Sequence, residues 1–260
     1  DIFSPMMSIS KRQSSSTILH TCSARVTLSV MKTIGLIGGM SWESSAEYYR
    51  IINETIKARK GPLYSAKSLM YTVNFHEVER MQHTGEWEKA GEVLVDAAQR
   101  LERGDADCIV LCTNTMHKLA NVIEAAVKIP FIHIADATVE KIKEQGMKKI
   151  GLLGTGFTME QDFYKGRLTE KYGLEVIVPE KPDRDTVHRI IYDELCQGKT
   201  ERSSKAEYVR ILQDLANQGA EGIILGCTEI MLLVGQTDSP VPIFDTTTIH
   251  AVAAVDYALG

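Results

Sequence analysis

The sequence lacks the features that mark several large classes of protein. No apolar run in its 260 residues approaches the length of about 18 residues that a membrane-spanning helix needs. The net charge is −5, acidic and basic residues are mixed along the chain, and no basic segment is interleaved with aromatic residues. We therefore expect a protein that binds neither a membrane nor nucleic acid.

The number and spacing of the cysteines also fit neither a disulfide-rich protein nor a metal site. The five cysteines are odd in number and irregularly spaced, and they lie at Cys22, Cys108, Cys112, Cys196 and Cys227. No Cys-x-x-Cys pair or compact His/Cys cluster has the spacing of a metal site. Irregular free cysteines in a chain of this size are typical of a reducing compartment, so we expect reduced thiols, a cytoplasmic protein and no bound metal.

The first 31 residues differ from the rest of the chain. They are rich in serine and threonine, carry Lys11, Arg12 and Arg25, and have Asp1 as their only acid. This composition fits an organellar transit peptide, but it fits equally well an upstream extension of a protein that starts at Met31. We expect residues 1–31 to be disordered or foreign to the folded protein and exclude them from the fold.

From residue 32 onward, short apolar runs alternate with amphipathic stretches. The apolar runs predict buried parallel strands at 34–37, 68–74, 108–111, 131–134, 150–153, 174–178, 222–225 and 242–244. The amphipathic stretches predict helices at 42–60, 87–103, 116–127, 138–145, 159–172, 185–196, 205–218 and 248–259. Such alternation is typical of a doubly wound α/β architecture.

Two strand-and-turn segments occur twice. Ile-Gly-Leu-Ile-Gly-Gly-Met at 34–40 aligns with Ile-Gly-Leu-Leu-Gly-Thr-Gly at 150–156, and the segment at 107–115 aligns with that at 221–229. Nearly the same number of residues separates the members of each pair. Buried strands resemble one another by composition alone, but this does not account for the small polar residues that follow each strand.

We therefore predict two pseudo-symmetric α/β lobes with parallel sheets. The first comprises residues 32–130 and 247–260, and the second comprises residues 131–246. Ligands of such sheets bind beyond the carboxyl ends of the strands. The repeated loops should accordingly face a shared active site between the lobes.

The second of these repeats carries a thiol in one lobe and a hydroxyl in the other. Cys227 follows the strand at 222–225, and the alignment places Thr113 opposite it, whereas Cys112 falls opposite Gly226. Neighbouring side chains of an extended strand point to opposite sides. Thr113 is thus expected to face the active site and Cys112 the interior of its lobe, an orientation that a local bulge would reverse.

Three motifs together resemble the aspartate/glutamate racemase family. They are Gly-Gly-Met-Ser-Trp at 38–42, Cys-Thr-Asn-Thr-Met-His at 112–117 and Gly-Cys-Thr-Glu at 226–229, and the resemblance extends from Met31 to about Leu259. It implies two α/β lobes, an isomerase without pyridoxal phosphate or any other cofactor, and a small amino-acid substrate. It also implies one cysteine from each lobe on either face of the substrate α-carbon, and a homodimer as a reasonable expectation.

This chain departs from that pattern in the first lobe. Family members have a cysteine directly before Asn-Thr, where this sequence has Thr113, with Cys112 one residue earlier. A threonine hydroxyl is far too weakly acidic to replace a thiolate as a mobile base, but it can donate or relay a proton. The resemblance assigns the second-lobe cysteine to the L-face. We therefore predict that Cys227 removes the α-proton of an L-amino acid and that Thr113, or else Cys112, serves the other face, with a preference for the L-enantiomer.

Polar residues in the same loops are candidates for binding the substrate. They can donate hydrogen bonds to the α-carboxylate or contact the side chain, although turn and helix-capping roles would explain many of them equally well. The candidates are Met40, Ser41, Gln82, Asn114, Thr115, Thr155, Lys165, Thr228 and Glu229. None is an unambiguous cationic partner for an acidic side chain, since Arg80 and Lys165 also fit exposed surface positions. The preferred amino acid therefore stays open between aspartate or glutamate and a broader range.

Other functions fit the same scaffold. An enzyme similar to maleate isomerase or arylmalonate decarboxylase needs one working cysteine, and a non-catalytic module could bind a small molecule between the lobes. Nucleotide binding is excluded, because the Gly-rich turn at 35–40 lacks the Gly-x-Gly-x-x-Gly pattern and no Walker lysine is present.

Overall fold

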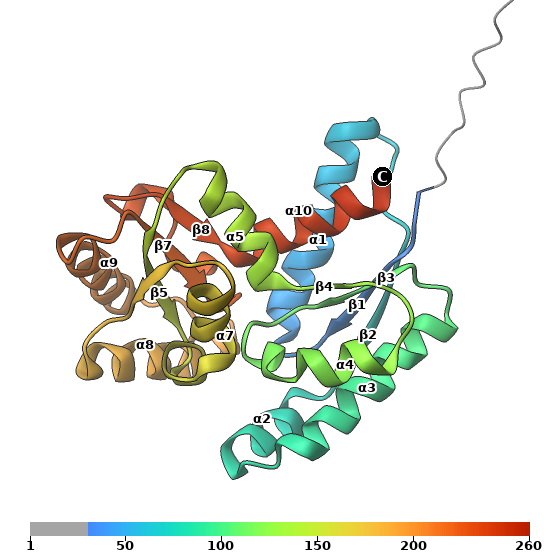
Figure 1. Cartoon of the computed structure of the whole chain (residues 1–260), viewed down its shortest axis with the longest axis horizontal. Helices are drawn as coiled ribbons and strands as arrows, with labels where there is room; N and C mark the ends of the chain where they lie inside the picture. Colours follow the sequence, from blue (N-terminus) through green and yellow to red (C-terminus); the bar gives the residue numbers. More distant parts are fainter. Residues whose placement is uncertain (1–30) are drawn as a thin grey trace, which may run out of the picture.

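The computed structural model describes residues 31–260 as two α/β lobes that lie side by side (Figure 1). The N-terminal extension expected at 1–31 lies outside the described residues, apart from Met31. Among the described residues, no helix combines the length and apolar character needed to cross a membrane.

Each lobe is built on a parallel sheet of four strands. The first sheet has the order β2-β1-β3-β4 and the second has the order β6-β5-β7-β8. The strands of the first are β1 (Ile34–Gly38), β2 (Ser68–Thr72), β3 (Cys108–Leu111) and β4 (Phe131–Ile132). Those of the second are β5 (Lys149–Gly154), β6 (Glu175–Ile177), β7 (Gly222–Gly226) and β8 (Ile243–Asp245). The two predicted pseudo-symmetric lobes with parallel sheets are confirmed.

The strand register repeats between the lobes. Ile34 of β1 pairs with Cys108 of β3, and the aligned residue Ile150 of β5 pairs with Gly222 of β7. Since both sheets also share one strand order, the loops that follow β3 and β7 occupy equivalent positions. The sequence alignment of Thr113 with Cys227 therefore holds in three dimensions.

Helices cover both faces of each sheet because the central strands are buried on both sides. In the first lobe, α1 (Trp42–Lys60) and α10 (Thr246–Leu259) pack on one face, and α2 (Phe75–Thr84) and α3 (Trp87–Arg103) on the other. The second face also carries the 3₁₀ helix η1 (Thr115–Leu119) and α4 (Ala120–Ala126).

The second lobe has the same layered arrangement. One face of its sheet carries α5 (Ile134–Glu144), α7 (Asp162–Gly166) and the π-helical turn η2 (Arg167–Lys171). The other carries α8 (Lys181–Asp193), η3 (Leu195–Gln197), α9 (Arg202–Asn217) and η4 (Ile230–Leu232). The short α6 (Gly156–Glu160) follows β5, and η5 (Gln236–Asp238) precedes β8.

Several helices differ from their predicted bounds because capping residues lie outside the apolar pattern. The helix expected at 138–145 begins at Ile134, where the His133 side chain accepts a hydrogen bond from the amide of Ala135. The helix expected at 159–172 is divided, since Gln161 has an extended backbone that ends α6. Helix α2 lies in a segment for which no helix was predicted.

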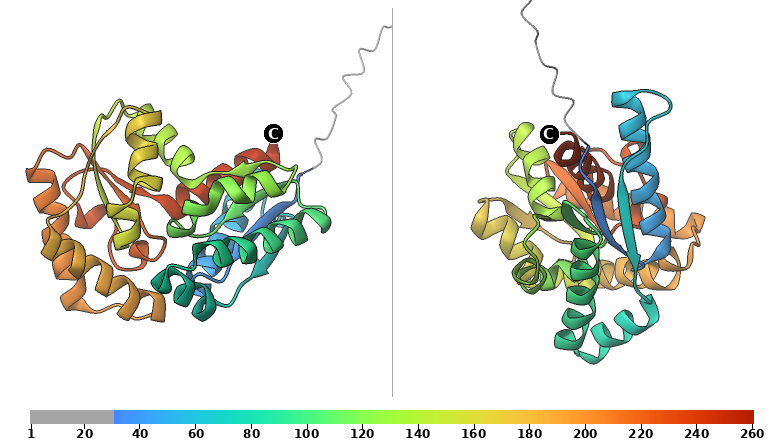
Figure 2. Two further views of the ribbon diagram at one scale, coloured as in Figure 1. Left: turned by 60° about the horizontal axis from the view of Figure 1, so that its bottom comes forward. Right: turned by 90° about the vertical axis from the view of Figure 1, so that its right-hand side faces the viewer.

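The chain passes between the lobes twice, once after β4 and once after β8. β4 pairs with β3 in the first sheet, so Phe131 and Ile132 lie in that sheet although the sequence division assigned them to the second lobe. The return segment enters α10, which packs against α1 of the first lobe and against α5. Figures 1 and 2 show α5 and α10 at the junction of the two sheets.

Candidate active site

The loops after the central strands of both sheets converge on one small pocket. Its lining comes from both lobes and consists of Met40, Phe75, Gln82, Thr113, Thr115, Thr155, Ile191, Tyr192, Cys196, Cys227 and Glu229. The free volume between these side chains is about 20 Å³, close to the space that one water molecule needs. A ligand larger than water can therefore enter only after some of these side chains move apart.

The first loop turns sharply after β1 to bring Met40 to the pocket. Gly39 has a φ of +95°, a conformation that other residues rarely adopt, and a Cβ there would lie 2.3 Å from the carbonyl oxygen of Val73. The next residue but one, Ser41, caps α1 by accepting a hydrogen bond from the amide of Ser44. The turn thus requires glycine, and the cap fixes where α1 begins.

Thr113 and Cys112 point in different directions at the end of β3. The Cys112 amide continues the sheet by donating to the carbonyl of Ile37, while the Thr113 amide turns back to the carbonyl of Leu111 at 2.8 Å. Thr113 lines the pocket. Cys112 is fully buried in the core beneath α1 and α10, where burial raises the pKa of its thiol.

Cys227 lies opposite, at the end of β7, and its thiol contacts a buried carboxylate. The Cys227 Sγ donates to Oε2 of Glu229 at 3.0 Å, and the hydroxyl of Thr228 donates to the same oxygen at 2.9 Å. Burial and, next, the negative charge of Glu229 raise the pKa of Cys227 well above its usual value. The thiol of the closed pocket is therefore protonated at neutral pH.

Glu229 also joins the two lobes. Its other oxygen, Oε1, accepts hydrogen bonds from the hydroxyl of Ser41 at 2.9 Å and from the amide of Ser41 at 3.3 Å. Ser41 belongs to the first lobe and Glu229 to the second. Both carboxylate oxygens are therefore occupied by protein donors rather than free for a substrate.

Three further hydrogen bonds cross the same region. The hydroxyls of Thr115 and Thr155 are 3.0 Å apart, and the Asn114 side chain donates to the hydroxyl of Thr246 at 3.0 Å. The Tyr192 hydroxyl donates to the side-chain oxygen of Gln82 at 3.1 Å. Thr155 and Tyr192 come from the second lobe, so the pocket walls are held together across the junction.

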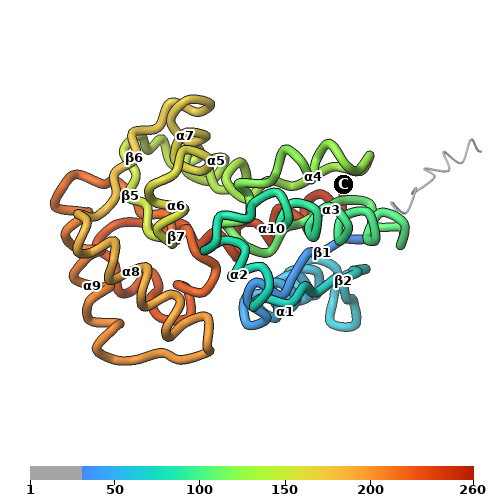
Figure 3. Tube along the Cα trace, turned by 90° about the horizontal axis from the view of Figure 1, so that it is seen from below, coloured from blue at the N-terminus to red at the C-terminus, as the bar shows by residue number. Residues whose placement is uncertain are grey.

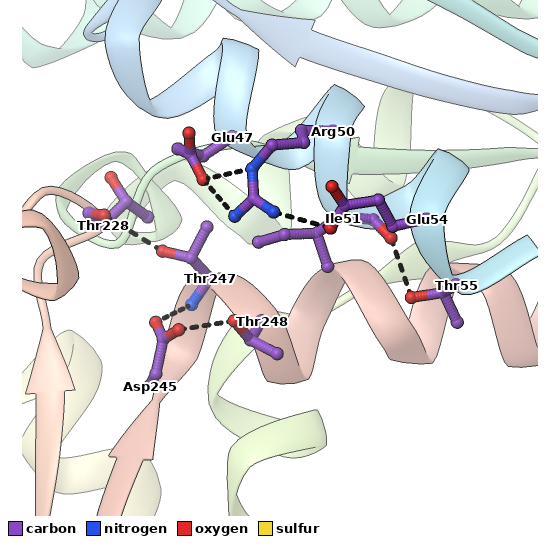
Figure 4. Close-up of polar contacts among 9 residues, drawn as sticks. All are labelled: Glu47, Arg50, Ile51, Glu54, Thr55, Thr228, Asp245, Thr247 and Thr248. Carbon is purple, nitrogen blue, oxygen red and sulfur yellow. Dashed lines mark hydrogen bonds and ion pairs between the residues drawn. The ribbon is translucent and has the colours of Figure 1, made fainter. Parts of the chain in front are cut away.

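The start of α10 anchors the Cys227 loop from below. The hydroxyl of Thr247 donates to the carbonyl of Thr228 at 3.1 Å, and Asp245 caps the helix by accepting from the amide of Thr247 (Figure 4). Figure 4 also shows Arg50 of the adjacent α1, which pairs with acidic side chains of its own helix. The residue after Cys227 is thus fixed to the second crossover of the chain.

Buried histidines support the Thr113 loop. The His117 Nε2 accepts a hydrogen bond from the amide of Ile134, so its Nδ1 carries the proton and donates to the carbonyl of Thr113 at 2.7 Å. The rings of His133 and His250 pack against that of His117. Burial lowers the pKa of all three, to about 3 for His133 and to about 4 for His250.

Aromatic side chains of the two lobes contact one another next to the pocket-lining residue Tyr192. His83 and Trp87 of the first lobe make edge contacts with Phe157 of the second lobe, and His83 also contacts Tyr192. Figure 3 looks at the molecule from below, the side on which α2 and α8 both lie. These ring contacts therefore also join the two lobes.

The structure brings most of the predicted site residues together. Those that line the pocket are Met40, Gln82, Thr113, Thr115, Thr155, Cys227 and Glu229. Others are buried just behind it and bonded to neighbouring protein groups, namely Ser41, Asn114 and Thr228. Cys112 and Lys165 do not line it, since Cys112 lies in the core and Lys165 is on a partly exposed position of α7.

Four lining residues were not identified from the sequence: Phe75, Ile191, Tyr192 and Cys196. They come from α2, α8 and η3, which carry no motif. The repeat offered one signal, because α2 and α8 each follow the edge strand of their own sheet. Among the described residues, no group of three or more His, Cys, Asp or Glu side chains could hold a metal ion.

Comparison with known proteins places this geometry in a family context. Residues 37–254 match the sequence model of the family described as Asp/Glu/Hydantoin racemase. The broad specificity amino-acid racemase RacX of Bacillus subtilis is 26% identical over 169 residues, which are 65% of this chain and 72% of RacX.

Two crystal structures are similar over almost their whole length. A Yersinia pestis protein proposed to be an Asp/Glu racemase is 57% identical, with a TM-score of 0.83, and the match covers 88% of this chain and 100% of that one. An aspartate racemase homologue from Pyrococcus horikoshii OT3 is 37% identical, with a TM-score of 0.77 and coverage of 88% and 99%.

Proposed function

Because the chain belongs to the Asp/Glu/Hydantoin racemase family of isomerases, we propose that it racemises an amino acid at its α-carbon, with acid–base groups of unequal strength on the two faces. Cys227 serves the face from which an L-substrate loses its proton. Thr113 serves the opposite face by donating a proton, directly or through water. Asp/Glu substrates and neutral amino acids are both within the proposed range.

One observation carries this proposal. Thr113 and Cys227 occupy equivalent positions after β3 and β7, and both line a single pocket. Racemisation removes a proton from one face of the α-carbon and returns one to the other, so two groups from opposite sides are what the reaction needs. Cys112, the residue next to Thr113 in sequence, is buried in the core of the first lobe instead, as is Cys108.

The lining of the pocket supports a substrate range wider than acidic amino acids. None of the described residues that line it is a lysine or an arginine, and Met40, Phe75 and Ile191 provide an apolar part of its wall. Arg80 is exposed on α2 and is not part of the lining. A distal carboxylate would lack a cationic partner in this closed state, whereas an apolar or hydroxyl-bearing side chain would not need one.

Exchange of the α-proton with D₂O tests the proposal. A panel of L- and D-amino acids is incubated with the protein, and both deuterium content and enantiomer ratio are followed. The proposed function predicts deuterium at the α-carbon and formation of the other enantiomer, while the total amount of the amino acid stays constant. A binding module would give neither, and an arylmalonate-decarboxylase-like enzyme would release carbon dioxide from malonates but leave the amino acids unlabelled.

A further inference from the structure

The pocket contains a second thiol that the proposed reaction leaves unused. Cys196 lies in η3, the three-residue turn after α8, and its side chain lines the pocket together with that of Cys227. Both side chains also pack in the same hydrophobic core of the second lobe. Of the described cysteines, Cys108 and Cys112 are buried in the first lobe and do not line the pocket. Two free thiols of the second lobe thus face one small space.

Several observations indicate that the two thiols are neighbours. The free volume between all the lining side chains is only about 20 Å³, close to the space of one water molecule. The Cys227 Sγ donates to Oε2 of Glu229 at 3.0 Å, and burial and, next, the charge of that carboxylate raise the pKa of Cys196. Cys196 itself follows burial and Glu229 among the causes that raise the pKa of Cys227. Since interactions between charges weaken with distance, these effects require the two sulfur atoms to be close.

The Cys196 side of this pair is the one that can adjust its position. η3 is a single 3₁₀ turn, and residues 197–203 at and beyond its end are all exposed. Cys227 instead follows the central strand β7, and the next residue, Thr228, is bonded to the start of α10. A disulfide needs Cβ atoms about 3.5–4.5 Å apart. A small shift of the Cys196 turn towards Cys227 should therefore cost less free energy than a shift of the strand end.

The proposed reaction makes Cys227 sensitive to oxidation. Removal of an α-proton needs a thiolate, and the thiolate is also the form of cysteine that peroxides oxidise. The first product is a sulfenic acid, which further peroxide converts into an irreversible sulfinic acid. A neighbouring thiol prevents this by condensing with the sulfenic acid to a disulfide, which reductants can reverse.

We propose that Cys196 is a resolving cysteine, which converts an oxidised Cys227 into an intramolecular disulfide and so inactivates the enzyme reversibly. The inference rests on the proposed racemase function for the role of Cys227. The disulfide itself can be detected without any measurement of activity, so the two proposals can fail separately.

Atoms and electrons balance with hydrogen peroxide as the oxidant. The Cys227 thiolate attacks one peroxide oxygen, the O–O bond breaks, and a sulfenic acid and hydroxide form. The Cys196 sulfur then attacks the sulfur of the sulfenic acid, an S–S bond forms, and the hydroxyl leaves with the thiol proton as water. Two electrons pass from the two cysteines to peroxide, and a dithiol reductant returns them.

Peptide mapping tests the bond directly. The full-length protein is treated with hydrogen peroxide, its free thiols are alkylated, and it is digested with trypsin without reduction. Cleavage after Lys199 and Arg210 places Cys196 and Cys227 on separate peptides, so the disulfide appears as a crosslinked pair that dithiothreitol separates. This pair is the expected main product. A Cys108→Ala variant, which removes a thiol outside the pocket, should give the same crosslink.

Recovery after reduction tests the consequence. Exchange of the α-proton of an L-amino acid is measured before excess peroxide, after it and after dithiothreitol, and each protein is compared with its own untreated rate. Wild type should regain its exchange, whereas Cys196→Ser should be oxidised further and recover on the order of tenfold less. Thermal melting checks that the variant folds, and Cys196→Ala replaces it if it does not.

Three results would overturn the inference. The first is wild-type protein without the crosslink, whether Cys227 stays reduced or becomes a sulfinic acid. The second is a crosslink from Cys227 to a cysteine other than Cys196, and the third is equal recovery in Cys196→Ser and wild type. Failure of the proposed function looks different, because untreated wild-type protein would then show no exchange with any amino acid.

Discussion

The two lobes present the same backbone to the pocket but different chemistry. The loop after β3 offers the hydroxyl of Thr113, supported from behind by His117, whereas the loop after β7 offers the thiol of Cys227, supported by Glu229. A hydroxyl and a thiol differ by several pKa units, so equivalent positions in the fold need not be equivalent in the reaction. The two lobes can therefore share the same fold while the residues that they contribute to the pocket differ in acid–base strength.

Thermodynamics determines which rate can reveal the difference between Thr113 and Cys227. Two enantiomers have the same free energy, so kcat/KM for racemisation must be equal in both directions for any site. The difference between Thr113 and Cys227 should instead affect exchange with retention, in which the enantiomer supplied is recovered with deuterium at its α-carbon. The expected preference for the L-enantiomer should therefore appear as a faster rate of exchange with retention for the L-enantiomer than for the D-enantiomer.

The largest effect is expected when the Cys227 thiol, the stronger of the two acid–base groups, is removed. Cys227→Ala should reduce deuterium incorporation from L-amino acids by about 10²- to 10⁴-fold, the usual contribution of a positioned acid–base group. Nuclear magnetic resonance of the α-proton follows this directly. Activity that survives the substitution would mean that another group, such as Cys196 in the same pocket, serves the L-face.

Replacing the Thr113 hydroxyl with a thiol, so that both lobes contribute the same acid–base group, should have the next largest effect. Thr113→Cys places a second thiol opposite Cys227, so exchange with retention of D-amino acids should rise on the order of 10²-fold. The measurement is deuterium in the recovered D-enantiomer by chiral chromatography and mass spectrometry. A rate no different from wild type would indicate that Thr113 does not face the α-carbon of the bound substrate.

Acid should lower the free energy of unfolding, because the histidines packed behind the Thr113 loop are buried in their neutral form. His133 and His250 are held neutral by burial, with pKa values lowered to about 3 and about 4. In the unfolded chain they take up protons near pH 6.5, so their contribution to stability is complete above that pH and is lost as the pH falls towards 4. Denaturant unfolding should lose about 1 kcal/mol per pH unit for each histidine across this range.

A His250→Asn variant provides the control for the acid effect. Its unfolding free energy at pH 7.5 should be lower, because the links from His250 to Tyr48 and to the carbonyl of Ile132 are weakened. Between pH 6.5 and 4, however, its stability should fall less steeply than that of the wild type. An identical slope would show that other groups cause the acid sensitivity.

The smallest effect is expected from a substitution that tests whether Cys112 or its neighbour Thr113 takes part in the reaction. Cys112→Ala shortens a core side chain beneath α1 and α10 and should cost about 1 kcal/mol of stability. Its exchange rate with L-amino acids should match that of the wild type, measured well below the melting temperature. Loss of exchange in a folded variant would place Cys112, rather than Thr113, in the reaction.

Much of the architecture could be predicted from the sequence, because local patterns determine it. The apolar runs at β1, β3, β5 and β7 and the repeated turns after them are short-range signals, and they were sufficient to predict two parallel lobes and to align Thr113 with Cys227. The same loops supplied most of the predicted site residues that line the pocket, among them Met40, Thr115 and Thr155.

The remainder depends on contacts between segments far apart in the chain. Tyr192 and Cys196 reach the pocket only because α8 packs beside the first lobe's α2, and no pattern in their own segment indicates this. The capped start of α5 and the break at Gln161 involve backbone geometry that hydrophobic periodicity does not report. The expected dimer stays a prediction, whereas the pairing of β4 with β3 places Phe131 and Ile132 in the first sheet.

The most direct test of the central claim compares the two faces in the unmodified protein. One L-amino acid and its D-enantiomer are each incubated in D₂O, and deuterium is measured in the recovered starting enantiomer before appreciable racemisation. Unequal acid–base groups predict that retained exchange is much faster for the L-enantiomer, because the Cys227 thiol exchanges its proton with solvent and the Thr113 hydroxyl is a far weaker base. Equal retained exchange for both enantiomers would contradict the account and indicate two groups of similar strength.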